Sequence, residues 1–309
     1  QRHPGVELLA AASAGEVMRR RGTVSLTVPV RQGSNVELQR DPQAFYEAFR
    51  PYDDIMDYLG SLVRHAPDTV EMVELEHETV EQRKIMAVRV RGAHWKPGAP
   101  RAIFTYTLHA REWISTMGGV YAAEQLIAKA THAPEELDNM EVVVVPVSNP
   151  DGFVHSATQD RFWRKNKAEH DGCQGVDLNR NFNWQWSREY EEGQIFDSAS
   201  CGEVFAGPHG ASEPETKALQ ALVEEAPLTV HLDFHSCGGY ILGPWSFMTI
   251  DHPRMSTILE LGGALKQAIK SLEGSDYSFC TGNECLYPVA GDLPDYATAL
   301  GALGFTIEM

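Results

Sequence analysis

The sequence lacks the long apolar runs that would carry a helix across a membrane. Such a helix needs about 18 consecutive apolar residues, and no stretch of the chain approaches that length. Residues 8–14 are apolar but short, and they lack the flanks of a signal peptide. Internal repeats and low-complexity tracts are also absent, so we expect one large α/β domain or two small ones in the 309 residues. A membrane is therefore not an expected partner.

Basic residues are scarce relative to acidic ones. The chain has 26 lysines and arginines against 43 aspartates and glutamates, which gives a formal net charge of −17 at pH 7. A surface of this sign repels phosphate backbones, so nucleic acid is not an expected partner. The simplest explanation of the acidity is solubility.

None of the five cysteines is spaced as a CxxC pair, which argues against a structural zinc knuckle. Two disulfides and one remaining thiol are the simplest arrangement, and they favour an oxidising compartment. We therefore expect a secreted or extracellular protein, with a vacuole or lysosome as the alternative location. Five buried, reduced cysteines are the alternative to disulfides. The cysteines are Cys173, Cys201, Cys237, Cys280 and Cys285.

From Phe45 onward, segments with strand character alternate with segments of helical periodicity. This alternation predicts a mostly parallel sheet covered by helices on both faces. Ligand sites in such folds lie beyond the carboxyl ends of the strands. The expected strands are 70–76, 84–90, 102–108, 141–147, 228–234 and 304–308, and the expected helices are 53–65, 114–130, 213–226 and 254–272.

The first 42 residues look unlike the rest of the chain. They contain a basic run at 19–21 and one possible strand at 23–30. We predict that residues 1–42 form an N-terminal arm or the remnant of a propeptide. Residues 43–309 then form the main domain.

Two of the expected strands are followed by residues that can bind a metal ion. His109 follows the strand at 102–108, and Glu112 comes three residues later, while His235 follows the strand at 228–234. Two imidazoles, one carboxylate and an open position are the pattern of a catalytic zinc site. HxxE spacing alone is common, and a histidine at a strand end is often an ordinary surface residue, so these positions need further support.

Several further motifs accompany these residues in order along the chain: Ala110–Ser115, Phe162–Lys165, Gly175–Asn181, His235–Ser236, Leu286–Pro288 and Phe305–Glu308. With these motifs, the chain resembles the zinc carboxypeptidases of the pancreatic A/B type from about Phe45 to Glu308. The resemblance implies a single α/β domain with a mixed, eight-stranded sheet. It also implies a monomer that binds one Zn²⁺ per chain and hydrolyses the last peptide bond at the C-termini of peptides and proteins.

The resemblance assigns roles to the residues of the metal site and its surroundings. His109, Glu112 and His235 match the zinc ligands, and Asp177 matches the carboxylate behind the first histidine, where it would fix the tautomer of the ligand. Glu308 matches the general base that accepts a proton from a zinc-bound water. Arg164 matches the fixed cation that neutralises the developing oxyanion. These matches make 43–309 the catalytic domain.

A second group of matching residues would recognise the substrate. Arg180 matches the arginine that grips the terminal carboxylate with two parallel N–H bonds, a geometry that lysine cannot copy. Asn179 matches an amide donor beside it, and Tyr287 matches the mobile tyrosine that covers the bound end. Arg111 matches a secondary carboxylate or subsite contact.

The resemblance also bears on the cysteines. Cys173 and Cys201 match the disulfide of the family, and Cys280 and Cys285 are candidates for a second pair. Cys237 would then be the odd thiol, close to the strand that ends at His235.

The chain departs from the family pattern at its carboxyl end and in the side-chain pocket. It ends at Met309, one residue after Glu308, whereas family members continue into a C-terminal helix, so we expect a truncated domain without that helix. Pro294 stands where basic-preferring members carry an aspartate, yet Asp292 lies two residues earlier. Asp292 could enter the pocket and select lysine or arginine. Alternatively, it caps the loop and faces solvent, leaving a pocket that favours apolar ends.

Two alternative functions remain open at this stage. One is a non-catalytic homologue that binds peptides, although the intact ligands and Glu308 argue against it. The other is a zinc deacylase that shares the HxxE and histidine ligands and acts on a small acyl amino acid. The presence of Asn179, Arg180 and Tyr287 argues against the deacylase.

Overall fold

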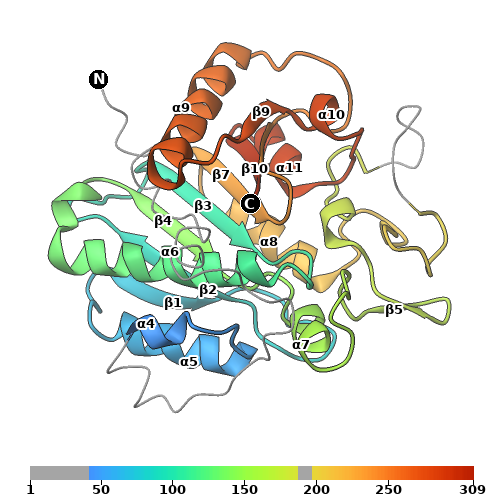
Figure 1. The fold of residues 1–309 in the computed structure, drawn as a ribbon, viewed down its shortest axis with the longest axis horizontal. Helices are drawn as coiled ribbons and strands as arrows, with labels where there is room; N and C mark the ends of the chain where they lie inside the picture. Colours follow the sequence, from blue (N-terminus) through green and yellow to red (C-terminus); the bar gives the residue numbers. More distant parts are fainter. Residues whose placement is uncertain (1–41, 187–196) are drawn as a thin grey trace.

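The computed structural model describes residues 42–186 and 197–309. The described strands of the main sheet are β1 (Val70–Glu74), β2 (Met86–Arg91), β3 (Arg101–Tyr106), β4 (Glu141–Val145), β7 (Val230–His235), β8 (Tyr240–Gly243), β9 (Ser278–Thr281) and β10 (Leu303–Glu308). They form one eight-stranded sheet in the order β1-β2-β4-β3-β7-β10-β8-β9 (Figure 1). A separate hairpin consists of β5 (Glu169–His170) and β6 (Cys173–Gln174).

Parallel pairing dominates in the middle of the sheet. β3 pairs parallel with β4 and β7, and β7 pairs parallel with β10. The outer β8–β9 pairing is also parallel, whereas β1–β2, β2–β4 and β8–β10 are antiparallel. The expected single α/β domain with a mixed, mostly parallel sheet is confirmed. Since β3, β7 and β10 run in the same direction, their carboxyl ends meet at one edge of the sheet.

Helices cover both faces of this sheet (Figure 1). One apolar core joins the sheet to α5 (Tyr52–Val63), α6 (Trp113–His132) and α9 (Met255–Glu273), and a second core joins the opposite face to α8 (Pro214–Glu224) and α11 (Leu293–Ala299). The valines of β4 alternate between the two cores, as the two-residue period of a strand requires. The shorter helices are α4 (Pro42–Phe45), α7 (Pro150–Thr158) and α10 (Gly282–Cys285). Within the described residues, no helix combines the length and the apolar character needed to cross a bilayer.

The sequence pattern predicts the long elements well and misses the short ones. All six expected strands and all four expected helices are present, although the strand expected at 70–76 ends at Glu74. The pattern misses β8 and β9, with four residues each, and α7 and α11, with nine and seven, because strands this short hold too few alternations, and helices this short too few turns, to establish a period. The possible strand at 23–30 and most of the expected N-terminal arm lie outside the described residues.

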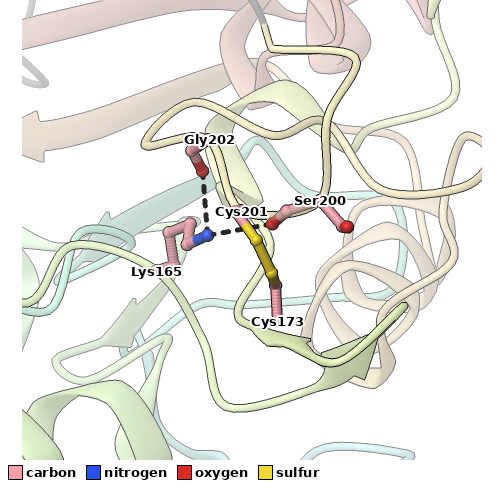
Figure 2. Close-up of a disulfide and its surroundings, with 5 residues drawn as sticks. All are labelled: Lys165, Cys173, Ser200, Cys201 and Gly202. Atoms are coloured by element: carbon pink, nitrogen blue, oxygen red, sulfur yellow. Dashed lines mark hydrogen bonds between the residues drawn. A yellow bond between two sulfur atoms is a disulfide. The ribbon is translucent and has the colours of Figure 1, made fainter.

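The described chain contains two disulfides. Cys173–Cys201 ties the β5–β6 hairpin to the loop that follows residue 197, and Cys280–Cys285 joins β9 to α10. Beside the first disulfide, the Lys165 ammonium donates hydrogen bonds to the carbonyls of Ser200, at 3.4 Å, and Gly202, at 2.8 Å (Figure 2). The two disulfides confirm both expected cysteine pairings. Cys237 is the free cysteine and is exposed.

Removing the first disulfide is expected to destabilise the fold more than removing the second. The two bridges span sequence separations of 28 and 5 residues. In the chain-entropy model, such loops correspond to about 3.5 and about 2 kcal/mol. Urea unfolding of the Cys173→Ser/Cys201→Ser and Cys280→Ser/Cys285→Ser variants measures both. An equal or smaller loss for the first variant would contradict the prediction.

Candidate metal centre and neighbouring clamp

Three side chains converge at the carboxyl edge of the sheet. His109 and Glu112 lie in the turn between β3 and α6, and His235 is the last residue of β7. The Glu112 carboxylate lies 2.7 Å from Nδ1 of His109 and 2.9 Å from Nδ1 of His235, and the two Nδ1 atoms are 3.0 Å apart. All three residues are buried. The structure therefore brings together the three ligands that the sequence predicts.

The turn that carries His109 is held in an unusual backbone conformation. Thr107 has a φ of 60°, in the left-handed region that a threonine rarely adopts. Its amide donates a hydrogen bond to Ser115 Oγ at 3.2 Å, and its hydroxyl lies 2.8 Å from that of Thr116. These contacts with the first turn of α6 stabilise the strained residue, so the strand ends sharply and His109 lies over the sheet edge.

A carboxylate lies behind each histidine. Nε2 of His109 is 3.2 Å from Asp177 Oδ1, and Nε2 of His235 is 2.9 Å from Asp233 Oδ2. Each carboxylate favours the tautomer that carries its proton on Nε2, which leaves both Nδ1 lone pairs directed at the centre. Two imidazole lone pairs and a carboxylate at contact distance repel one another unless a cation lies between them. This donor set fits a Zn²⁺ ion.

Sequence reasoning missed Asp233. Its position two residues before His235 places both side chains on the same face of β7. The spacing Asp-Phe-His therefore carried a usable signal, because alternate residues of a strand lie on one face, where their side chains can contact each other.

The electrostatics of the centre favour positive charge. Burial opposes a charged imidazole, but Asp233 and Glu112 together raise the pKa of His235 well above its usual value. Burial also opposes ionisation of Glu112, yet His109 and His235 lower the pKa of that carboxyl group below its usual range. The same field that holds a proton here would hold a metal cation in its place.

Asp177 connects the metal centre to Arg164. Its second oxygen, Oδ2, accepts hydrogen bonds from Nε and Nη2 of Arg164 at 2.9 and 2.8 Å. Although burial alone would raise it, the pKa of Asp177 lies well below the usual range because Arg164, Arg180 and His109 surround the carboxylate. The guanidinium of Arg164 is thus fixed beside the centre.

Glu308 completes this edge of the sheet. It is the last residue of β10 and lies opposite His235 in the parallel register of β7 and β10. Burial is the largest influence and raises the pKa of Glu308, His235 lowers it, Glu112 raises it, and His109 and Arg164 lower it, with a net increase. The structure thus places the predicted general base beside the candidate metal centre.

The predicted clamp lies next to the centre. Arg180 is buried, with Nη1 donating to the Asn179 carbonyl at 2.7 Å and Nη2 lying 3.4 Å from the Tyr287 hydroxyl. The amide group of Asn179 lies 3.4 Å from Nε2 of His235 and accepts a hydrogen bond from the Leu293 amide. Asn179 therefore lies between Arg180 and the candidate ligand His235.

Gly291 allows the chain after Tyr287 to approach the clamp. Its φ is 74°, and a Cβ atom there would lie 2.4 Å from the Arg180 carbonyl oxygen. Only glycine fits this position without displacing the backbone that carries Arg180.

Asp292 and Arg111 occupy different environments. Asp292 lies just before α11, is 3% exposed, and its Oδ1 atom has no hydrogen-bond partner. Burial raises the pKa of Asp292 to about 6. Because the side chain is buried, the alternative in which Asp292 faces solvent is wrong. Arg111 lies at the rim, where Nη1 contacts Glu203 Oε1 at 2.7 Å and the Phe162 carbonyl at 3.3 Å.

Comparison with known proteins gives one consistent family. The family model described as zinc carboxypeptidase matches residues 55–309. The metallocarboxypeptidase A-like protein of Trichophyton verrucosum is 30% identical over 260 residues, which cover 82% of this chain and 60% of that protein. Carboxypeptidase B of Astacus astacus is 31% identical over 274 residues, which cover 85% of this chain and 87% of that protein.

Solved structures show the same fold. Bovine thrombin-activatable fibrinolysis inhibitor, solved in complex with tick carboxypeptidase inhibitor, is 26% identical with a TM-score of 0.76, over 85% of this chain and 87% of that one. Carboxypeptidase A of Helicoverpa armigera is 29% identical with a TM-score of 0.76, over 85% of this chain and 64% of that one. This chain spans 60% of the length of the Trichophyton relative. By its sequence and its fold, the chain belongs to the zinc carboxypeptidase family.

Proposed function

We propose that the protein is a zinc-dependent exopeptidase that removes single residues from the C-termini of peptides and proteins. The observation that carries this proposal is the position of Asn179, which contacts His235 on one side and is followed directly by Arg180 of the clamp. A terminal carboxylate held by Arg180 leaves the last peptide bond of the substrate close to the metal donors. Cleavage of one residue at a time follows from that short separation.

The residues around the centre divide the reaction among them. A zinc ion held by His109, Glu112 and His235 would supply Lewis-acid polarisation and an activated water. Arg164, fixed by Asp177 at 2.8–2.9 Å, is positioned to donate to the carbonyl oxygen as negative charge develops on it. Glu308 accepts the proton of the attacking water and returns it to the leaving amine.

The disulfides support a location for this activity. Cys173–Cys201 and Cys280–Cys285 are stable in oxidising compartments and are rare in the cytosol. We therefore propose that the enzyme acts outside the cell or in an oxidising compartment.

The proposed zinc ligands can be tested by removing one imidazole. His235→Ala is expected to lose zinc and peptidase activity together, because Glu112 and His109 alone cannot hold the ion in a three-ligand site. Metal content and hydrolysis of a blocked dipeptide with a free C-terminus are the measurements. The control is His65→Ala, at an exposed position in the described chain. A His235→Ala protein that retains stoichiometric zinc would disprove the assignment.

Substrates with an amidated C-terminus are expected to be poor. The amide offers no negative charge to the buried Arg180 guanidinium, and losing the charge-assisted contact with the terminal carboxylate costs about 2–5 kcal/mol, or at least about 30-fold in kcat/KM. Arg180→Lys should narrow the gap between free and amidated peptides, because lysine cannot form the two parallel bonds. Equal kcat/KM values for free and amidated ends in the wild type would refute the exopeptidase proposal.

Asp292 is proposed to select basic C-terminal residues. Its unpartnered oxygen is buried, and an ion pair with a substrate lysine or arginine is worth about 1.5–3 kcal/mol, or about 10- to 100-fold. Since the carboxyl group ionises with a pKa of about 6, the preference for Arg over Phe should rise as the pH increases through that value. Asp292→Asn should abolish the rise, whereas Asp276→Asn, at an exposed site, should not. An unchanged Arg/Phe ratio in Asp292→Asn would favour an apolar pocket.

A further inference from the structure

We propose that Glu215, a buried carboxyl group in the first turn of α8, is a positioning residue that in its protonated form secures Asn166 behind Arg164 and Asp177. The proposal rests on the peptidase function proposed above. It concerns a group that touches neither the metal donors nor the clamp. Its starting point is a cluster of three fully buried side chains: Asn166, Glu213 and Glu215.

Asn166 uses its full hydrogen-bonding capacity inside this cluster. Its Nδ2 donates to Glu213 Oε2 at 2.7 Å and to Glu215 Oε2 at 3.0 Å. Its Oδ1 accepts from the amides of Ala168, at 3.3 Å, and Val176, at 2.8 Å. An amide side chain has two donors and two acceptor sites, so no part of Asn166 can move without losing a buried bond.

Asn166 joins the two chain segments that carry the site. It lies two residues after Arg164, and its contact Val176 directly precedes Asp177. The backbone amide of Asn166 also donates to the Val176 carbonyl at 3.1 Å. Arg164 is therefore two residues from Asn166, and Asp177 is one residue from its partner Val176. The salt bridge between Arg164 and Asp177 is thus adjacent to this link on both segments. Displacing Asn166 would shift the guanidinium and the carboxylate behind His109 together.

The surroundings of Glu215 favour its neutral form. Oε2 has Asn166 as its partner and Oε1 has none. Glu213, by contrast, also accepts from the Ser212 hydroxyl at 2.6 Å and contacts Nε2 of His170 at 3.1 Å. Glu213 is therefore the carboxylate that can hold a negative charge, and Glu215 is the one that keeps a proton.

The charged groups around the cluster reinforce this difference. Burial, together with the negative charges of Glu213 and Asp151, raises the pKa of Glu215 to about 8. The nearby cations are engaged elsewhere: Arg83 with Asp151, Lys165 with the carbonyls of Ser200 and Gly202, and Lys167 with Gln174. Ionisation of Glu215 would place two negative carboxylates on one amide group. The Asn166 hydrogen bond itself favours the ionised carboxylate, so the loosening would come from the repulsion between Glu213 and Glu215, which would drive the two acceptors of Asn166 apart and disturb Arg164.

The decisive variant is Glu215→Gln, which keeps a neutral group of the same shape at every pH. Wild-type kcat is expected to fall as the pH rises past about 8, to about one-tenth at about one pH unit above the pKa of the carboxyl group. Glu215→Gln should lack this fall while matching the wild type near neutral pH, and KM should change little because Arg180 is held by other contacts. Glu224→Gln, at the exposed end of α8, is the matched control and should follow the wild type.

Stability provides a second readout. The folded-state pKa of Glu215 lies above the ordinary value of 4.5, so its stabilising contribution is complete below that value and is lost as the pH rises through about 8. The unfolding free energy of the wild type relative to Glu215→Gln should decline across this window. A flat difference would overturn the protonated state. A declining difference without any change in the kcat profile would overturn the positioning role.

Zinc affinity distinguishes this proposal from the proposed function. Because Asp177 orients His109, a loosened Asn166 should weaken zinc binding above about pH 8 in the wild type and not in Glu215→Gln. Competition with a chelator measures this without any substrate. A protein that hydrolyses no peptide would refute the peptidase function, while parallel zinc-affinity profiles of the two proteins would refute the role of Glu215.

Discussion

The carboxylate of Asp177 is the interaction on which the site depends. One oxygen lies against His109 and the other accepts both bonds from Arg164. A single buried anion therefore favours one tautomer of His109 and fixes the guanidinium of Arg164 beside the candidate metal centre. Neither neighbour could keep its orientation without it, since a buried guanidinium needs a counter-charge and an imidazole needs a fixed acceptor.

The sheet supplies the platform for this arrangement. β3, β7 and β10 run parallel and adjacent, so His109, His235 and Glu308 follow or complete neighbouring strands at one edge. Arg164, Asp177, Asn179 and Arg180 come from the segment between α7 and α8, and Tyr287 and Asp292 come from the segment before α11. The Cys173–Cys201 disulfide and the Lys165 contacts fix the first of these regions (Figure 2). The strands and the turn after β3 thus place the candidate metal donors, and the cross-linked segments place Arg164, Arg180 and Tyr287 beside them.

The order of motifs was sufficient to anticipate the fold and the metal donors. Hydrophobic periodicity identified the long strands and helices, and the HxxE spacing, supported by resemblance, identified His109 and Glu112. Asp292 remained ambiguous, because the sequence does not record whether a polar loop residue is buried. The Asn166, Glu213 and Glu215 cluster was missed for a different reason. Its members meet across 47 and 49 residues, and contacts between distant polar side chains leave no spacing pattern.

The segment that carries Tyr287 is anchored at both ends. Before it, Cys285 is bonded to Cys280. After it, Gly291 packs so closely against the Arg180 carbonyl that an added Cβ atom would lie 2.4 Å from the oxygen. The intervening residues 286–290 therefore form a short segment that is fixed at both ends, called the strap here. The Val289 amide shortens it further by donating to the Ser246 carbonyl at 2.8 Å, so Tyr287 is held close to Arg180.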